Sequence, residues 1–80
     1  MHYVYLIKSI QFPEMLYVGY TTNLEERFQK HNEGGSTFTA KYRPFELVVY
    51  LSFSDESKAR EFEKYLKTQS GRAFANKRLW

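Results

Sequence analysis

The stretch HYVYLIKSIQFPEMLYVGY, residues 2–20, contains two short runs in which successive side chains alternate between two faces. Residues 2–7 and 16–20 follow the period of two that is typical of β-strands. The polar and turn-forming residues between them predict an antiparallel hairpin with a loop of several residues. In this hairpin we expect Tyr5 to lie roughly opposite Tyr17, so that both phenols share one face of the sheet.

The middle of the chain predicts a helix, a long loop and a third strand. The sequence Thr-Asn-Leu-Glu at residues 22–25 is typical of a capping box, and the helix is expected to run to about Glu33, just before a glycine pair. Residues 34–45 are expected to form the longest loop. Residues 46–53 are almost continuously apolar, so we expect them to form the central or best-buried strand, covered on both faces.

The last third of the chain predicts two further helices. One of residues 54–55 caps a helix that continues to about Gln69, and residues 72–79 are expected to form a short third helix. Ala73 and Phe74 would pack that helix on the sheet. The order β, β, α, β, α, with a possible final α, predicts an α+β fold in which a small three-stranded antiparallel sheet is packed with helices.

The composition indicates one folded domain, residues 1–80. Hydrophobic residues make up 42% of the chain and aromatic residues 19%, which excludes a disordered protein. Cysteine is absent, so disulfides and thiolate metal sites are excluded, and this fits a reducing compartment. The longest apolar runs, 3–7 and 47–51, are too short for a membrane span or a signal peptide. We therefore expect a soluble, cytoplasmic protein.

Charge is distributed unevenly along the chain. Residues 1–57 carry five Lys or Arg against seven Asp or Glu, a net charge of −2, whereas residues 58–80 carry seven against two, a net charge of +5. Such a basic end can attract a polyanion such as nucleic acid. It is equally compatible with a solvated basic helix face and tail.

Two of the predicted helices carry ionisable residues on stripes that are otherwise apolar. On the first helix, Arg27 and His31 share a flank with the core residues Leu24 and Phe28. On the second helix, Glu63 belongs by its spacing to the inward apolar stripe. A cation, an imidazole and a carboxylate are therefore expected to meet the two phenols of the hairpin at one edge of the core.

These residues resemble the GIY-YIG nuclease domain over essentially the whole chain. The segments that match its motifs are, in order, Tyr3-Val4-Tyr5, Tyr17-Val18-Gly19, Arg27 to His31 and Glu63 to Lys67. Their order, intervals and placement on strands and helices make the resemblance specific. Tyr3 stands where the motif name has glycine, and two valines replace isoleucine. The ending FEKYLKTQSGRAFANK, residues 62–77, is similar to that of small stand-alone bacterial members.

The resemblance implies a divalent-metal-dependent endonuclease that hydrolyses DNA phosphodiester bonds through a tyrosine-activated water. Glu63 would hold one Mg²⁺ or Mn²⁺ ion, in a site with a single carboxylate where the ion keeps much of its hydration. Arg27 would bind the phosphate, and His31 would orient the nucleophile or accept its proton. Either Tyr5 or Tyr17 would activate water, which requires nearby positive charge because a free phenol ionises only at about pH 10.

The expected substrate is DNA, recognised without sequence specificity or by its structure. Lys41, Arg43, Lys67 and Arg72 are candidates for contacts with backbone phosphates. A single small domain would bind DNA weakly, so dimerisation or a protein partner would help to target the domain to DNA. The alternative is a non-catalytic nucleic-acid-binding module of the same fold, which needs no carboxylate at position 63. Glu63 itself could instead have only a structural role, as the i, i+4 ion-pair partner of Lys67.

Overall fold

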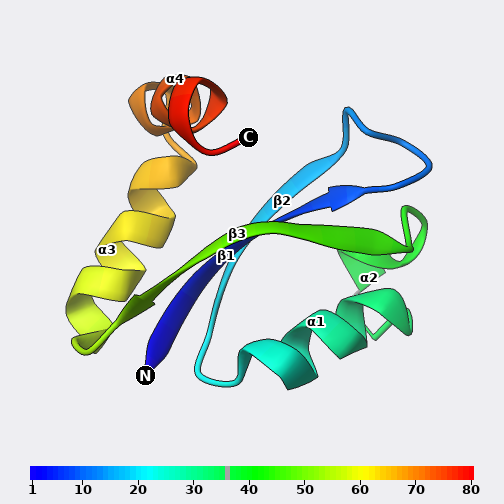
Figure 1. Cartoon of the computed structure of the whole chain (residues 1–80), viewed down its shortest axis with the longest axis horizontal. Coiled ribbons are helices and arrows are strands. Elements are labelled where there is room, and N and C mark those ends of the chain that lie inside the picture. Colours follow the sequence, from blue (N-terminus) through cyan, green and yellow to red (C-terminus); the bar gives the residue numbers. More distant parts are fainter. Residues whose placement is uncertain (36) are drawn as a thin grey trace.

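A single sheet of three antiparallel strands, in the order β2-β1-β3, organises the molecule. In the computed structural model, which describes residues 1–35 and 37–80, the strands are β1 (His2–Ser9), β2 (Leu16–Thr21) and β3 (Phe45–Phe53). Figure 1 shows the twisted strands running between two groups of helices. The α+β class and the three antiparallel strands predicted from the sequence are confirmed.

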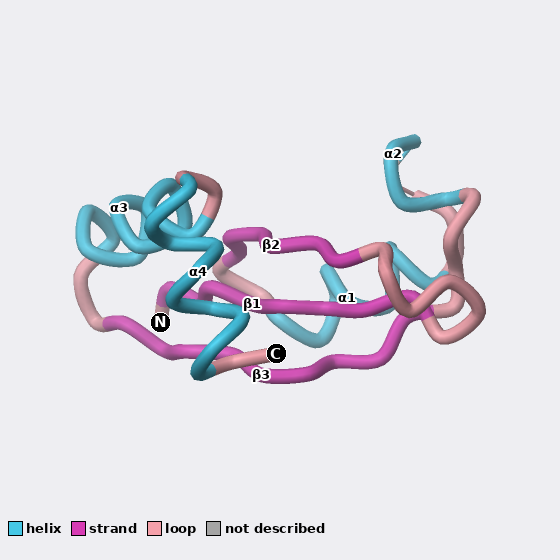
Figure 2. The backbone as a smooth tube through the Cα atoms, turned by 90° about the horizontal axis from the view of Figure 1, so that it is seen from above, coloured by secondary structure: helices cyan, strands magenta, loops and turns pink. Residues whose placement is uncertain are grey.

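Helices flank the sheet on both faces. One face is covered by α1 (Leu24–Asn32), and the other by α3 (Glu56–Leu66) and α4 (Gln69–Arg78), as Figures 1 and 2 show. A single helical turn, α2 (Thr37–Ala40), lies in the segment that was expected to be a loop. Among the described helices, none combines the length and the apolar character needed to cross a membrane.

The central strand is β1, and its side chains fill a core on each face of the sheet. The core on the α3 side contains Val4, Leu6, Ala59, Leu66 and Ala75, and the core on the α1 side contains Tyr5, Ile7 and Phe45. The expectation that residues 46–53 form the central strand is wrong, because β3 lies at the edge and pairs with β1. An apolar run shows that a strand is partly buried, but the number of its partners depends on long-range pairing.

The hairpin register differs by two residues from the expected one. Tyr5 pairs with Gly19, and Tyr17 pairs with Ile7. Because side chains alternate with a period of two, a shift of two residues keeps both phenols on the same face. The prediction that they share a face is therefore confirmed, and their ring centroids are 6.2 Å apart.

The start of α1 lies one residue later than the predicted box. Asn23 is the N-cap, and its Oδ1 accepts a hydrogen bond from the backbone N–H of Glu26 at 3.2 Å. The helix ends as expected, because Gly34 adopts φ +80°, a conformation that glycine adopts at no steric cost. This local geometry fixes where the last turn of α1, with its histidine, meets the sheet.

The break between α3 and α4 was misplaced by the sequence pattern. Asp55 caps α3 as one of the two expected residues, but this helix ends at Leu66, and Thr68 caps α4 by accepting from the N–H of Gly71 at 3.1 Å. That glycine is therefore inside α4 rather than after α3. A Cβ there would lie 1.7 Å from the carbonyl oxygen of Tyr65, so glycine is required by close helix packing.

The contact of α4 with the rest of the molecule also differs from the expectation. Ala75 is the buried residue of α4 that joins the core, whereas Ala73 is exposed. Phe74 is 39% exposed and packs edge-on against Phe62. The buried residues of α4 are Gly71 and Ala75, which lie four residues apart and therefore on one face of the helix.

Candidate active site

Tyr5 lies at the centre of the cluster of ionisable residues. It comes from the central strand, is 0% exposed, and its hydroxyl lies 2.8 Å from Nε2 of His31. Its oxygen also accepts a hydrogen bond from Nε–H of Arg27 at 3.2 Å. A Cβ at Gly19 would lie 2.3 Å from Cζ and from the hydroxyl oxygen of Tyr5, so the space left by this glycine is filled by the phenol.

The hydrogen-bond network favours one tautomer of His31. Because Arg27 donates to the Tyr5 oxygen, the buried phenol needs an acceptor for its own hydrogen, and Nε2 of His31 is in place to accept it. Nδ1–H then donates to Oγ1 of Thr39 at 2.8 Å. Burial, and then the charge of Arg27, lower the pKa of His31, which agrees with a neutral ring.

Thr39 is a site residue that sequence reasoning missed. It is 1% exposed and belongs to α2, the helical turn that was expected to be a loop. Its position eight residues after His31 follows no helical or strand period, so no pattern connects the two. A hydroxyl-bearing residue in a predicted loop is common and gave no specific signal.

Arg27 links the buried network to the surface. Its side chain is partly buried, and hydrogen bonding to Tyr5, together with a weaker contribution from a hydrogen bond to Tyr17, raises its pKa. Tyr17 is also partly buried, and its ring centroid lies 5.0 Å from that of His31. Two phenols, an imidazole and a guanidinium thus form one cluster, in which Tyr5 and Tyr17 each interact with both Arg27 and His31.

Charge from α3 reaches this cluster. Burial raises the pKa of the Tyr5 phenol, the hydrogen bond from Arg27 opposes that shift, and the charges of Tyr17 and Glu63 add to it. The charge of Glu63 thus acts on the Tyr5 phenol, as the smallest of these contributions. The four residues predicted on the hairpin and α1 are brought together directly, and Glu63 approaches them from the other helix layer.

Glu63 forms an ion pair with Lys67, the C-cap residue of α3, and the Glu63 side chain is 18% exposed. This is the ion pair expected for a structural role of Glu63. In the described part of the chain there is no group of three or more His, Asp or Glu that would enclose a metal. A single shielded carboxylate fits one Mg²⁺ or Mn²⁺ that completes its shell with waters and substrate oxygens, so the residues present fit the ion only as an open site.

The predicted phosphate-binding cations lie in different places. Lys67 and Arg72 line a groove of about 640 Å³ between the start of β2 and α4, which we call the β2–α4 groove, and Tyr17 lines it too. Arg43 lies instead at the end of α1, because a Cβ at Gly34 would lie within contact distance of its guanidinium. Lys41 is exposed. Two of the four cations are therefore next to the candidate site.

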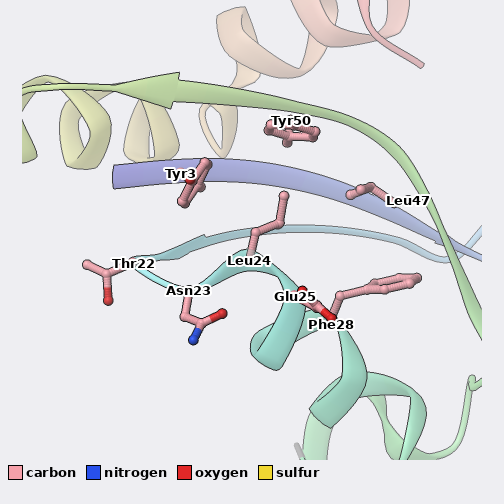
Figure 3. A pocket seen from close by; sticks show the side chains of 8 residues that line it. All are labelled: Tyr3, Thr22, Asn23, Leu24, Glu25, Phe28, Leu47 and Tyr50. Atoms are coloured by element: carbon pink, nitrogen blue, oxygen red, sulfur yellow. The ribbon is translucent and has the colours of Figure 1, made fainter. Parts of the chain in front are cut away.

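A second hollow, of about 510 Å³, lies between the start of α1 and the sheet (Figure 3). Its lining residues are Tyr3, Thr22, Asn23, Leu24, Glu25, Phe28, Leu47 and Tyr50. They include neither a Lys or Arg nor any of the clustered residues. This hollow is therefore separate from the tyrosine–arginine–histidine cluster.

The sheet and its tyrosine–arginine–histidine cluster define the class of the protein as a small α+β domain with a three-stranded antiparallel sheet, and a solved structure shares this fold. The solved NMR structure of the UPF0213 protein BH0048 from Bacillus halodurans has a TM-score of 0.57 and 29% sequence identity, and the match covers 95% of this chain and 82% of that one.

The chain belongs to the GIY-YIG family, because the model of the GIY-YIG catalytic domain matches residues 1–78. A UPF0213 protein of Staphylococcus haemolyticus is 44% identical, with 86% of this chain and 83% of that protein covered. A UPF0213 protein of Clostridium perfringens is 40% identical, over 84% of this chain and 71% of that protein. The family resemblance inferred from the motifs is thereby confirmed.

Proposed function

We propose that this protein is a divalent-metal-dependent endonuclease that hydrolyses DNA phosphodiester bonds through a tyrosine-activated water. The observation that carries the proposal is the Arg27 guanidinium, which a buried phenol holds at the edge of the sheet beside a second phenol and near a carboxylate. A partly exposed cation held in this way suits a group that binds phosphate. Family membership supports the same reaction class.

Arg27 binds the scissile phosphate. Its Nε–H is engaged by Tyr5, so contacts with phosphate come from the terminal amino groups of the guanidinium. The bond to the buried phenol removes much of the rotational freedom of a long side chain. A guanidinium that is oriented before the substrate arrives loses less entropy on binding.

The two tyrosines have different tasks. Tyr5 is fully buried and donates to His31, so this pair positions Arg27 and does not contact substrate. Tyr17 is partly exposed and lies beside Arg27, so it is the phenol that a solvent water can reach. Tyr17 acts as a phenolate, which the neighbouring guanidinium stabilises, and it becomes a neutral phenol when it accepts the proton of the attacking water.

Glu63 holds the metal ion, one Mg²⁺ or Mn²⁺. A bound ion of this kind supplies Lewis-acid stabilisation of the charge on the phosphate and on the leaving oxygen. Lys67 is the present partner of the carboxylate and must release it when the site is loaded. Its ammonium then becomes available to a substrate phosphate.

The substrate is DNA, bound through its backbone without sequence readout or according to its structure. Lys67 and Arg72 contact phosphates close to the site, and Lys41 and Arg43 contact phosphates further away. The site depends on few cations, so a protein partner that delivers the domain to DNA would raise its effective affinity. The domain acts in the cytoplasm, where DNA and a reducing environment coincide.

The test is cleavage of duplex, single-stranded and branched DNA in the presence of Mg²⁺ or Mn²⁺. We expect Glu63→Gln and Arg27→Lys each to reduce the cleavage rate by about a hundred-fold or more. Glu61→Gln is the matched control, since it removes an exposed carboxylate on the same helix and should cut like the parent. A Glu63→Gln variant that cuts as fast as the parent contradicts the assignment.

The second candidate is a non-catalytic nucleic-acid-binding module. The Glu63–Lys67 ion pair favours it, because a carboxylate that only anchors a lysine needs no metal. This candidate predicts that none of the DNA substrates is cut, while salt-sensitive binding persists and is insensitive to Mg²⁺. Cleavage that a chelator abolishes would exclude it.

A further inference from the structure

The lining of the β2–α4 groove includes apolar side chains and the indole ring of Trp80. Leu66 and Ala75, both buried in the core, form part of its lining together with Val18. Trp80 stands at the end of α4, and its backbone N–H donates to the carbonyl of Ala75 at 2.9 Å. Its volume of about 640 Å³ lies within the range of small-ligand sites, roughly 300–1,000 Å³.

This groove shares one wall with the candidate active site. Tyr17 lines the groove and also packs against the rings of Tyr5 and His31. The wall is thus formed by the phenol that lies beside Arg27. A molecule in the groove would therefore lie against the phenol that interacts with Arg27.

The polar groups around the groove favour an anionic ligand that also carries hydrogen-bond donors and acceptors. Lys67, Arg72 and Asn76 line it from the α3–α4 side, and Glu14 is its acidic residue. Arg72 is exposed and forms no ion pair within the described part of the chain. Its guanidinium is available for a phosphate, and Asn76 carries both donors and an acceptor that a base edge can use.

From these features we infer that the β2–α4 groove is a nucleobase subsite, which takes one unstacked base of the strand whose phosphate is bound at Arg27. The inference rests on the proposed function and names its substrate class, DNA with an unpaired nucleotide next to the scissile bond. The base stacks against Trp80, and Arg72 binds the phosphate that follows. A base inside a continuous duplex is paired and stacked and has to be extruded before it can enter.

The binding test needs no cleavage and uses the protein as it is. Trp80 is the single tryptophan of the chain, so its fluorescence reports on the groove. In a chelating buffer, the protein is titrated with an oligothymidylate and with an abasic oligomer of the same length. We expect the thymidylate to quench the fluorescence and to bind at least about five-fold more tightly, because base–aromatic stacking adds to phosphate contacts. Equal affinities, or no quenching by either oligomer, would overturn the inference.

A variant pair separates stacking from folding. With a labelled oligothymidylate, Trp80→Leu should weaken binding about five-fold or more, whereas Trp80→Phe should keep most of it, since a ring still offers a stacking face. Tyr65→Ala is the control, because it removes an exposed aromatic ring outside the groove. If Trp80→Leu weakens binding of the oligothymidylate and of the abasic oligomer equally, Trp80 serves only packing and the subsite is refuted.

Substrate choice gives the last readout. The parent should cut a duplex with one unpaired thymidine beside the cleavage point faster than the fully paired duplex, and Trp80→Leu should lose this preference. A parent that cuts both duplexes at the same rate refutes the subsite and leaves the nuclease proposal standing. Absence of all cleavage refutes the nuclease proposal, while the quenching titration still decides whether a base binds in the groove.

Discussion

Replacing Tyr5 by Phe removes one oxygen from the interior of the molecule and keeps the ring. The oxygen is bonded to His31 at 2.8 Å and to Arg27 at 3.2 Å. Tyr5 is 0% exposed and His31 is 1% exposed, so no water can replace the lost hydroxyl without rearrangement. A buried acceptor left without its donor costs about 1–3 kcal/mol, whereas the partly exposed guanidinium can turn to solvent at less cost.

We therefore expect Tyr5→Phe to lower the free energy of unfolding by about 2 kcal/mol, which corresponds to a fall of roughly 10 °C in the melting temperature of so small a domain. Urea unfolding at pH 7.5 measures the change. Tyr50→Phe is the matched control, since its parent side chain is 50% exposed, and it should stay within about 0.5 kcal/mol of the parent protein. If the two variants are equally stable, the buried network does not hold the fold as we argue.

Three further predictions follow from single contacts. Gly19→Ala puts a methyl group 2.3 Å from the buried ring and should destabilise the protein by about 1–3 kcal/mol in urea unfolding, whereas Gly35→Ala, with its nearest neighbour at 3.2 Å, should cost less. Burial lowers the pKa of His31, so the unfolded state takes up a proton first as the pH falls below about 6.5; stability should decline there, and His31→Asn should flatten that decline in urea titrations from pH 7.5 to 5. Lys67→Gln frees the carboxylate of Glu63 and should raise Mn²⁺ affinity about two-fold, measured by paramagnetic broadening in NMR spectra, and unchanged affinity would show that the ion pair does not compete.

Local patterns allowed the elements and their faces to be predicted. The alternation in residues 2–7 places Tyr5 on the α1 face, and this holds although the hairpin register shifted by two residues. The helical spacing of Arg27 and His31 puts both on the side of α1 that meets the phenols. Such features depend on neighbours a few residues away, which the sequence displays directly.

What could not be predicted depends on distant contacts. The apolar run of residues 46–53 indicated a central strand, but β1 lies in the centre because it pairs with both other strands. The sequence pattern placed the end of α3 near Gly71, because glycine commonly follows a helix. In the structure Gly71 lies inside α4, where it allows the close approach of α4 to the end of α3. Thr39 meets His31 only because α2 folds back against α1.

The candidate site draws on both faces of the sheet, and the edge position of β2 makes this possible. Tyr17 touches the ring of His31 on the α1 side and lines a groove with Lys67 on the α3 side. The charge of Glu63, which belongs to α3, acts on the buried Tyr5 across the same region. Because β2 is an edge strand, its outer side leaves an opening between the two helix layers. Side chains from both layers can therefore reach one phosphate that is bound there. A further strand paired to β2 would close that opening, so we expect this edge to stay unpaired in any form of the domain that cuts DNA.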